Sequence, residues 1–173
     1  QISMVRKSYR TEESTNTTMK TPRTSQEWYD SIKNDPDKVI NWLKDQYHGE
    51  VTAAVRIREL ILCYTPPTGN TKWADTVELI ASQEEDHAQW VGELLRARGI
   101  EPTTLVKDER YWDNTINQIT DWDTGCAVAA HAEKMRLERI RVICADPATP
   151  QDIAEVFGRI VVQEEFHEKA FRE

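Results

Sequence analysis

The chain is poor in cysteine and in long apolar runs, and both shortages exclude classes of protein. Its 173 residues include only Cys63, Cys126 and Cys144, with no CxxC spacing. An odd count without paired spacing argues against a disulfide framework, so we expect a reducing, cytoplasmic setting. No run of about 18 apolar residues is present, which argues against a membrane span. The opening QISMVRKSYR lacks the apolar core of a signal peptide, but a start at Gln1 leaves an earlier segment open.

Positive charge is also scarce. The chain has 22 Lys and Arg against 30 Asp and Glu, a formal net charge of −8. This balance argues against a nucleic-acid partner bound through general basicity, and against an anionic membrane surface. Strand-like alternation is missing over any useful length. The length suits one domain with a buried core, or one domain with an arm.

The sequence is instead rich in helical periodicity. Apolar residues recur at helical spacing over 36–63, 71–98, 122–145 and 150–173. Asp35 before Pro36, and Thr149 before Pro150, place a capping side chain ahead of a proline at the first helical position. The stretch YTPPTGN at 64–70 and Gly99 are placed to end the first two helices.

These signals predict an all-α fold, an antiparallel four-helix bundle over residues 36–173. The first and last connections are short, which makes the helices that they join antiparallel. The connection 99–121 is a long crossover between the second and third helices, with a short turn of helix around Tyr111 and Trp112. Residues 1–35 are polar and are expected to form an arm, with a short helix capped by Ser25.

Two hexapeptides, SQEEDH at 82–87 and VQEEFH at 162–167, place the same charges on inward helical faces. A Glu and a His three residues apart lie on one face, one turn apart. The two halves repeat more widely, because HGE at 48–50 matches HAE at 131–133 at an offset of 83. Each half therefore pairs a lone inward Glu with a Glu-x-x-His. The aligned residues are Glu50, Glu84, His87, Glu133, Glu164 and His167.

Four carboxylates and two imidazoles would meet at mid-height in such a bundle. Burying them without compensation would cost several kcal/mol per charge. Two divalent cations balance the four negative charges, with one imidazole nitrogen for each ion and carboxylates shared between them. This donor set suits Fe and Mn, and Zn is less expected.

The other charged residues near these motifs are expected to differ in role. Glu85, Asp86 and Glu165 fall off the inward stripe and should be solvated. His48 and His131 are expected to face outward or pack at a helix edge. Arg136, three residues after Glu133, is placed either to reach a ligand or to lie at the surface.

The set Glu50, Glu84-x-x-His87, Glu133, Glu164-x-x-His167 resembles the ligand signature of the ferritin-like di-iron carboxylate superfamily. That group includes bacterioferritins, rubrerythrins, Dps-like archaeal proteins and bacterial multicomponent monooxygenases. The resemblance covers about 36–173 and implies a ferritin-like bundle whose six residues bind two Fe ions, with Mn/Fe or Mn as alternatives. One departure is clear, because rubrerythrin peroxidases carry a further Glu where this chain has Arg136.

The resemblance also implies a chemistry, carried by the six ligands through the metals. The expected function is an oxidoreductase that reacts with O₂ or peroxide and oxidises Fe(II) or a small organic substrate, with an electron donor as a further partner and a homo-oligomeric state. Two alternatives stay open: a ferritin-like storage cage subunit or encapsulated cargo, and a metal that only holds the bundle together. The sequence distinguishes neither the substrate nor Fe/Fe from Mn/Fe.

Overall fold

The computed structural model describes residues 23–106 and 109–173, so most of the predicted arm lies outside the described residues. Every regular element in the described part is an α-helix, which confirms the all-α prediction. The helices are α1 (Ser25–Asp30), α2 (Pro36–Leu60), α3 (Thr71–Arg96), α4 (Arg110–Ile116), α5 (Trp122–Ala145) and α6 (Gln151–Arg172). Among the described helices, none is both long and apolar enough to cross a membrane. The division at residue 35 stays a prediction.

The helix starts follow from capping side chains at three of the four long helices. The Asp35 carboxylate accepts from the backbone N–H groups of the next turn, ahead of Pro36. Asn70 caps α3, and Asp121 forms a capping box with Thr124 at α5. At α6 the prediction of a Thr149 cap is wrong.

The Thr149 hydroxyl is used elsewhere, which is why it does not cap α6. It donates to the Ile143 carbonyl oxygen at 2.6 Å and also bonds the Tyr29 hydroxyl. The helix therefore begins at Gln151, without a side-chain cap. At the end of α3, Gly99 adopts a φ of 75°, a left-handed conformation that favours glycine, and Ile100 N–H closes the turn onto Leu95 O.

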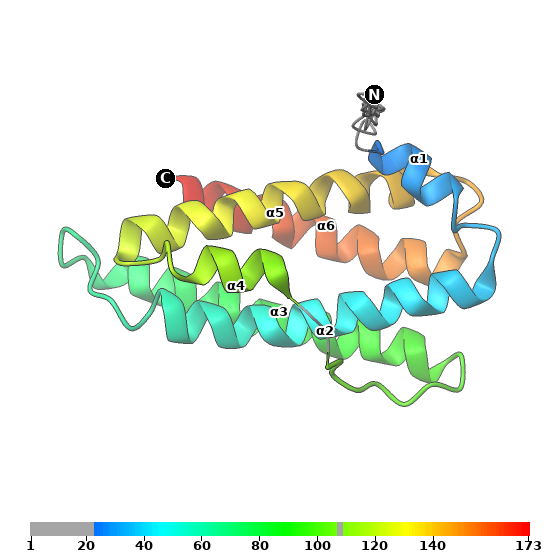
Figure 1. Cartoon of the computed structure of the whole chain (residues 1–173), viewed down its shortest axis with the longest axis horizontal. Helices are drawn as coiled ribbons and strands as arrows, with labels where there is room; N and C mark the ends of the chain where they lie inside the picture. The colour runs from blue at the N-terminus through cyan, green and yellow to red at the C-terminus, as the bar shows by residue number, and fades with distance from the viewer. Residues whose placement is uncertain (1–22, 107–108) are drawn as a thin grey trace, which may run out of the picture.

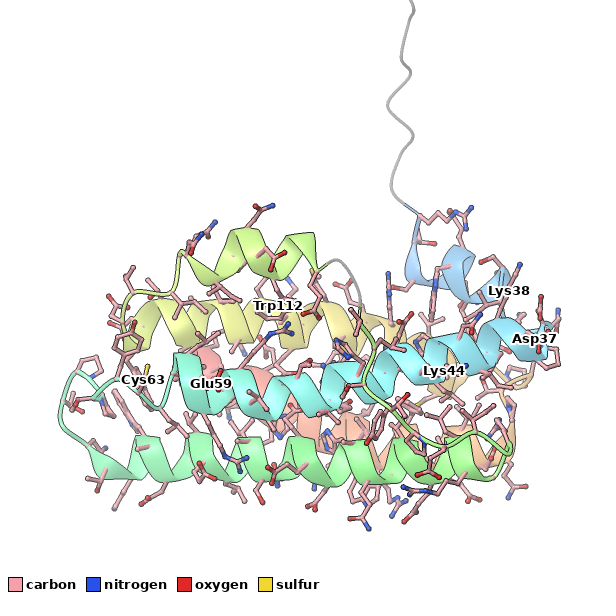
Figure 2. All side chains as sticks on the ribbon, turned by 60° about the horizontal axis from the view of Figure 1, so that its bottom comes forward. Asp37, Lys38, Lys44, Glu59, Cys63 and Trp112 are labelled. Carbon is pink, nitrogen blue, oxygen red and sulfur yellow. The ribbon has the colours of Figure 1, made fainter. Side chains whose placement is uncertain are left out.

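The four long helices form two antiparallel pairs, α2 with α3 and α5 with α6 (Figure 1). The connection from α3 returns along the length of the bundle and carries α4 before α5 begins, as the long-crossover prediction requires (Figure 1). In both views α4 lies along α2 and α5, and its Trp112 stacks on Arg56 of α2 (Figure 2).

Two apolar clusters fill the interior and leave a charged layer between them. One cluster lies around Trp42, Leu95 and Phe157, and the other around Ile57, Ile80 and Phe171. Along each long helix, the inward Glu or Glu-x-x-His falls between residues of the first cluster and residues of the second. The charged residues are therefore held at mid-height, with apolar side chains excluding water on both sides.

Candidate metal centre

All six residues singled out from the sequence meet in the charged layer. Glu50 comes from α2, Glu133 from α5, and the two Glu-x-x-His pairs from α3 and α6. Five of the six side chains are fully buried and Glu133 is nearly so. The repeat in the sequence thus becomes an approximate two-fold arrangement of helices around one polar cluster.

The cluster divides into two groups of donor atoms. One contains Glu50, Glu84, His87 and Glu164, the other Glu84, Glu133, Glu164 and His167, and in each the donor atoms lie within 4.8 Å of one another. We call them the Glu50 set and the Glu133 set. Such a span is close to what one ion with bonds of about 2.1 Å can bridge.

Glu84 and Glu164 belong to both sets because each turns one oxygen to each side. Glu84 Oε2 and Glu164 Oε1 both lie 3.6 Å from His87 Nδ1. Their other oxygens, Glu84 Oε1 and Glu164 Oε2, lie 3.1 and 3.3 Å from His167 Nδ1. The two sets are therefore joined by two shared carboxylates, an arrangement suited to a pair of ions.

Both histidines are oriented by a glutamine from the opposite motif. His87 Nε2–H donates to Gln163 Oε1 at 2.7 Å, and His167 Nε2–H donates to Gln83 Oε1 at 2.8 Å. Each glutamine directly precedes an inward Glu, yet it serves the histidine of the other helix. A proton held at Nε2 leaves Nδ1 free to face the carboxylates, as a metal ligand requires.

The sequence reasoning did not assign a role to these glutamines. The signal was nevertheless present, because Gln occupies the same place in SQEEDH and VQEEFH. The pairing itself crosses between helices and could not be derived from either hexapeptide alone.

Two of the carboxyl groups favour the protonated form when no metal balances them. Burial raises the pKa of Glu50 to about 8, with Arg136 opposing the shift. Burial also raises the pKa of Glu133 well above its ordinary value, helped by the negative charges of Glu164 and Glu84.

The shared carboxylates behave in the opposite way. Burial alone would raise the pKa of Glu164, but Arg136 and hydrogen bonds from its neighbours hold that pKa well below its ordinary value. Hydrogen bonds likewise outweigh burial and lower the pKa of Glu84. Burial opposes the charged form of His87, yet the surrounding carboxylates raise its pKa to about 12. A metal ion that enters must therefore displace protons.

Arg136 takes the first of its two predicted placements and reaches the ligand carboxylates. Its Nη1 atom lies 3.1, 3.3 and 3.0 Å from Glu50 Oε2, Glu84 Oε2 and Glu164 Oε1. These are the three oxygens that also face His87 Nδ1 at 3.6 Å. The guanidinium therefore faces the Glu50 set.

The flanking residues follow the predictions with one exception. Glu85, Asp86, Glu165 and His131 are exposed, and Glu85 and Glu165 pair with arginines on neighbouring helices. His48 was expected to face outward or pack at a helix edge, and the first of these alternatives is wrong. It is buried beneath the long connection, where its Nδ1 accepts from Leu105 N–H at 3.0 Å and its Nε2 bonds Glu109 at 3.1 Å.

A cavity of about 100 Å³ lies between α2 and α5 under α4. Its lining includes Glu133 and Arg136, so it reaches the cluster, and Trp112 contributes from α4. Small side chains such as Ala53 and Ala132 leave the space open. The volume admits a molecule of a few heavy atoms.

The donor atoms fit metal ions on their own chemistry. Four buried polar atoms of the cluster have no hydrogen-bond partner: Glu50 Oε1, His87 Nδ1, Glu133 Oε2 and Glu164 Oε2. Buried polar atoms are normally satisfied, so atoms left open and converging are the expected form of a ligand set without its ions. Carboxylate and imidazole donors suit iron and manganese.

Fold and site together define a ferritin-like helical bundle with a buried carboxylate–histidine cluster that can hold metal. The rubrerythrin family model matches residues 41–173, and the chain belongs to the rubrerythrin family, a group of ferritin-like di-iron carboxylate proteins. No curated protein and no solved structure matches the chain.

Proposed function

We propose that the chain binds two iron ions in the Glu50 and Glu133 sets and reacts with O₂ or peroxide to oxidise Fe(II) or a small organic substrate. The sharing of Glu84 and Glu164 between the two sets carries this proposal. Two separate sites would bind metal equally well, but shared carboxylates hold two ions as a pair. Membership of the rubrerythrin family supports iron as the metal.

Bound iron would supply the electrons by which O₂ or peroxide is reduced. The chain's own residues hold and isolate the centre. Gln83 and Gln163 fix the two imidazoles by their Nε2–H groups. The two apolar clusters keep bulk water from the charged layer.

The cavity beside Glu133 supports a reactive centre over a purely structural one. Structural metal sites are closed, whereas reactive ones keep an approach for a small molecule. A cavity of about 100 Å³ admits O₂, peroxide or a compact substrate, but not a bulky one. An electron donor would have to deliver electrons from outside the bundle. We also expect a homo-oligomer.

The test begins with metal-free protein loaded anaerobically with two Fe(II) per chain and then exposed to O₂ or to hydrogen peroxide. Fe(II) is followed with a chromogenic chelator at mildly acidic pH, where free Fe(II) oxidises slowly. We expect loss of Fe(II) far faster than in buffer alone. Glu164→Ala should abolish the acceleration, while Glu165→Ala, which changes the exposed neighbour, should retain it.

Other outcomes would select the alternatives. Uptake of many iron ions per chain, with a large closed oligomer by light scattering, would indicate storage. Tight metal binding that raises the melting temperature without any accelerated loss of Fe(II) would leave only a structural metal and refute the proposal.

A further inference from the structure

The repeat that generates the two donor sets is broken at one position next to the cluster. At the offset of 83 that aligns Glu50 with Glu133, Arg136 aligns with Ala53. Both residues line the same cavity. The chain thus has a cation at one of two equivalent places and a methyl group at the other.

The cation acts on one donor set much more than on the other. Arg136 Nη1 bonds the oxygens of Glu50, Glu84 and Glu164 that face His87, at 3.0 to 3.3 Å. The oxygens of Glu84 and Glu164 that face His167 receive no hydrogen bond from this guanidinium. The Glu50 set therefore receives the direct hydrogen bonds of the cation, while Glu133 interacts with its charge without such a bond.

The charges of the cluster lead to the same asymmetry. Two divalent ions balance four ionised carboxylates in full, so a guanidinium in addition leaves one positive charge in excess. One divalent ion together with Arg136 leaves one negative charge, and a second ion turns this into one positive charge. Like charges in a buried, low-dielectric site repel strongly, so the second ion is disfavoured while Arg136 stays in place.

The structure also provides a place to which the guanidinium can withdraw. Its Nη2 atom passes over Gly49, where an added Cβ would lie 3.6 Å away. The neighbouring cavity is lined by Ala53 and Ala132 and has a volume of about 100 Å³. The arginine side chain is long and flexible enough to turn from the carboxylates into this space.

We propose that Arg136 makes the two metal positions unequal: the first ion enters the Glu133 set, and the second enters the Glu50 set only when it displaces the guanidinium from the three carboxylate oxygens. The inference rests on the proposed function, since it takes a pair of metal positions for granted. It assigns to this chain an ordered loading that the ligand residues alone do not impose.

The test uses Mn(II) under anaerobic conditions, followed by titration calorimetry and electron paramagnetic resonance. The wild type should bind one Mn(II) as an isolated ion and the second at least about tenfold more weakly, with the spectrum of a coupled pair appearing only then. Glu133→Gln should abolish the tight event, whereas Glu50→Gln should retain it.

Arg136→Met, which keeps the length without the charge, should bring the two affinities within about threefold. Arg136→Lys, which keeps a cation, should retain part of the difference in affinity between the first and the second Mn(II). The double variant Ala53→Arg, Arg136→Met should restore the difference in affinity but with the Glu50 set binding the first Mn(II). In that background Glu50→Gln should abolish the tight event. Circular dichroism checks that each variant is folded.

Three results would each overturn the inference while leaving the proposed function intact. They are equal affinities for the two ions in the wild type, a first ion in the Glu50 set, and an unchanged difference in affinity in folded Arg136→Met. Absence of any Mn(II) binding, by the wild type and by Arg136→Met alike, would instead remove the proposed function along with it.

Discussion

Gln163 offers a sharp test of the crossed arrangement, because it stands next to Glu164 but orients His87. In Gln163→Leu the acceptor 2.7 Å from His87 Nε2 is lost, and the imidazole is fully buried. A buried N–H left without a partner costs about 1–3 kcal/mol. The loss also frees the ring to turn, so metal affinity should fall about 10- to 100-fold, which corresponds to about 1.4–2.7 kcal/mol.

The loss should be confined to the Glu50 set, since Gln83 serves His167. We expect the full effect on Mn(II) binding when Gln163→Leu is combined with Glu133→Gln, which leaves only the Glu50 set. Combined with Glu50→Gln, it should change affinity less than about threefold. Gln163→Glu retains an acceptor and should bind within a few-fold of its parent. Equal weakening in both backgrounds would refute the assignment.

Three further predictions concern the stability of the metal-free protein, measured by thermal unfolding. Arg136→Met leaves buried carboxylates without their cation, which should cost about 3–5 kcal/mol of unfolding free energy and lower the melting temperature by roughly 6–20 °C. With Mn(II) bound this loss of stability should vanish. An equal loss in the metal-free and metal-bound states would contradict the counter-ion role. Burial raises the pKa of the Glu50 carboxyl in the folded protein to about 8, so the folded protein binds this proton more tightly than the unfolded chain does. The stability that the bound proton contributes is fully present below the pKa of Glu50 in the unfolded chain. That contribution is lost as pH rises through about 8, and the melting temperature should fall between pH 5 and pH 9 in the wild type, less so in Glu50→Gln. Tyr29→Phe removes the bond to Thr149 that ties α1 to the bundle and should cost about 0.5–1.5 kcal/mol without changing Mn(II) binding.

The helices and the two Glu-x-x-His pairs could be predicted because both depend on local rules. Helical periodicity, proline and capping residues mark the long helices, and a Glu and a His three apart must share a face whatever the tertiary fold. The lone Glu50 and Glu133 carry no local motif, and only the internal repeat located them.

The features that escaped prediction depend on contacts between distant segments. Thr149 has the form of a cap, but Tyr29 and the Ile143 carbonyl oxygen claim its hydroxyl. His48 lies on a helix edge in the periodic pattern, yet the long connection folds over it. No sequence rule states where a crossover will rest, because its path is set by packing rather than by periodicity.

Arg136 shows why the repeat both reveals and conceals the site. Aligning the halves identifies the ligands because they are alike, but the residue that would make the two metal positions behave differently is one at which the halves differ, Arg136 against Ala53. An arginine three residues after a buried Glu has two available environments, and only the position of Glu50 and Glu164 across the bundle decides between them. A repeat therefore predicts what the two halves hold in common, and the positions that break it near the cluster are where unequal chemistry should be sought.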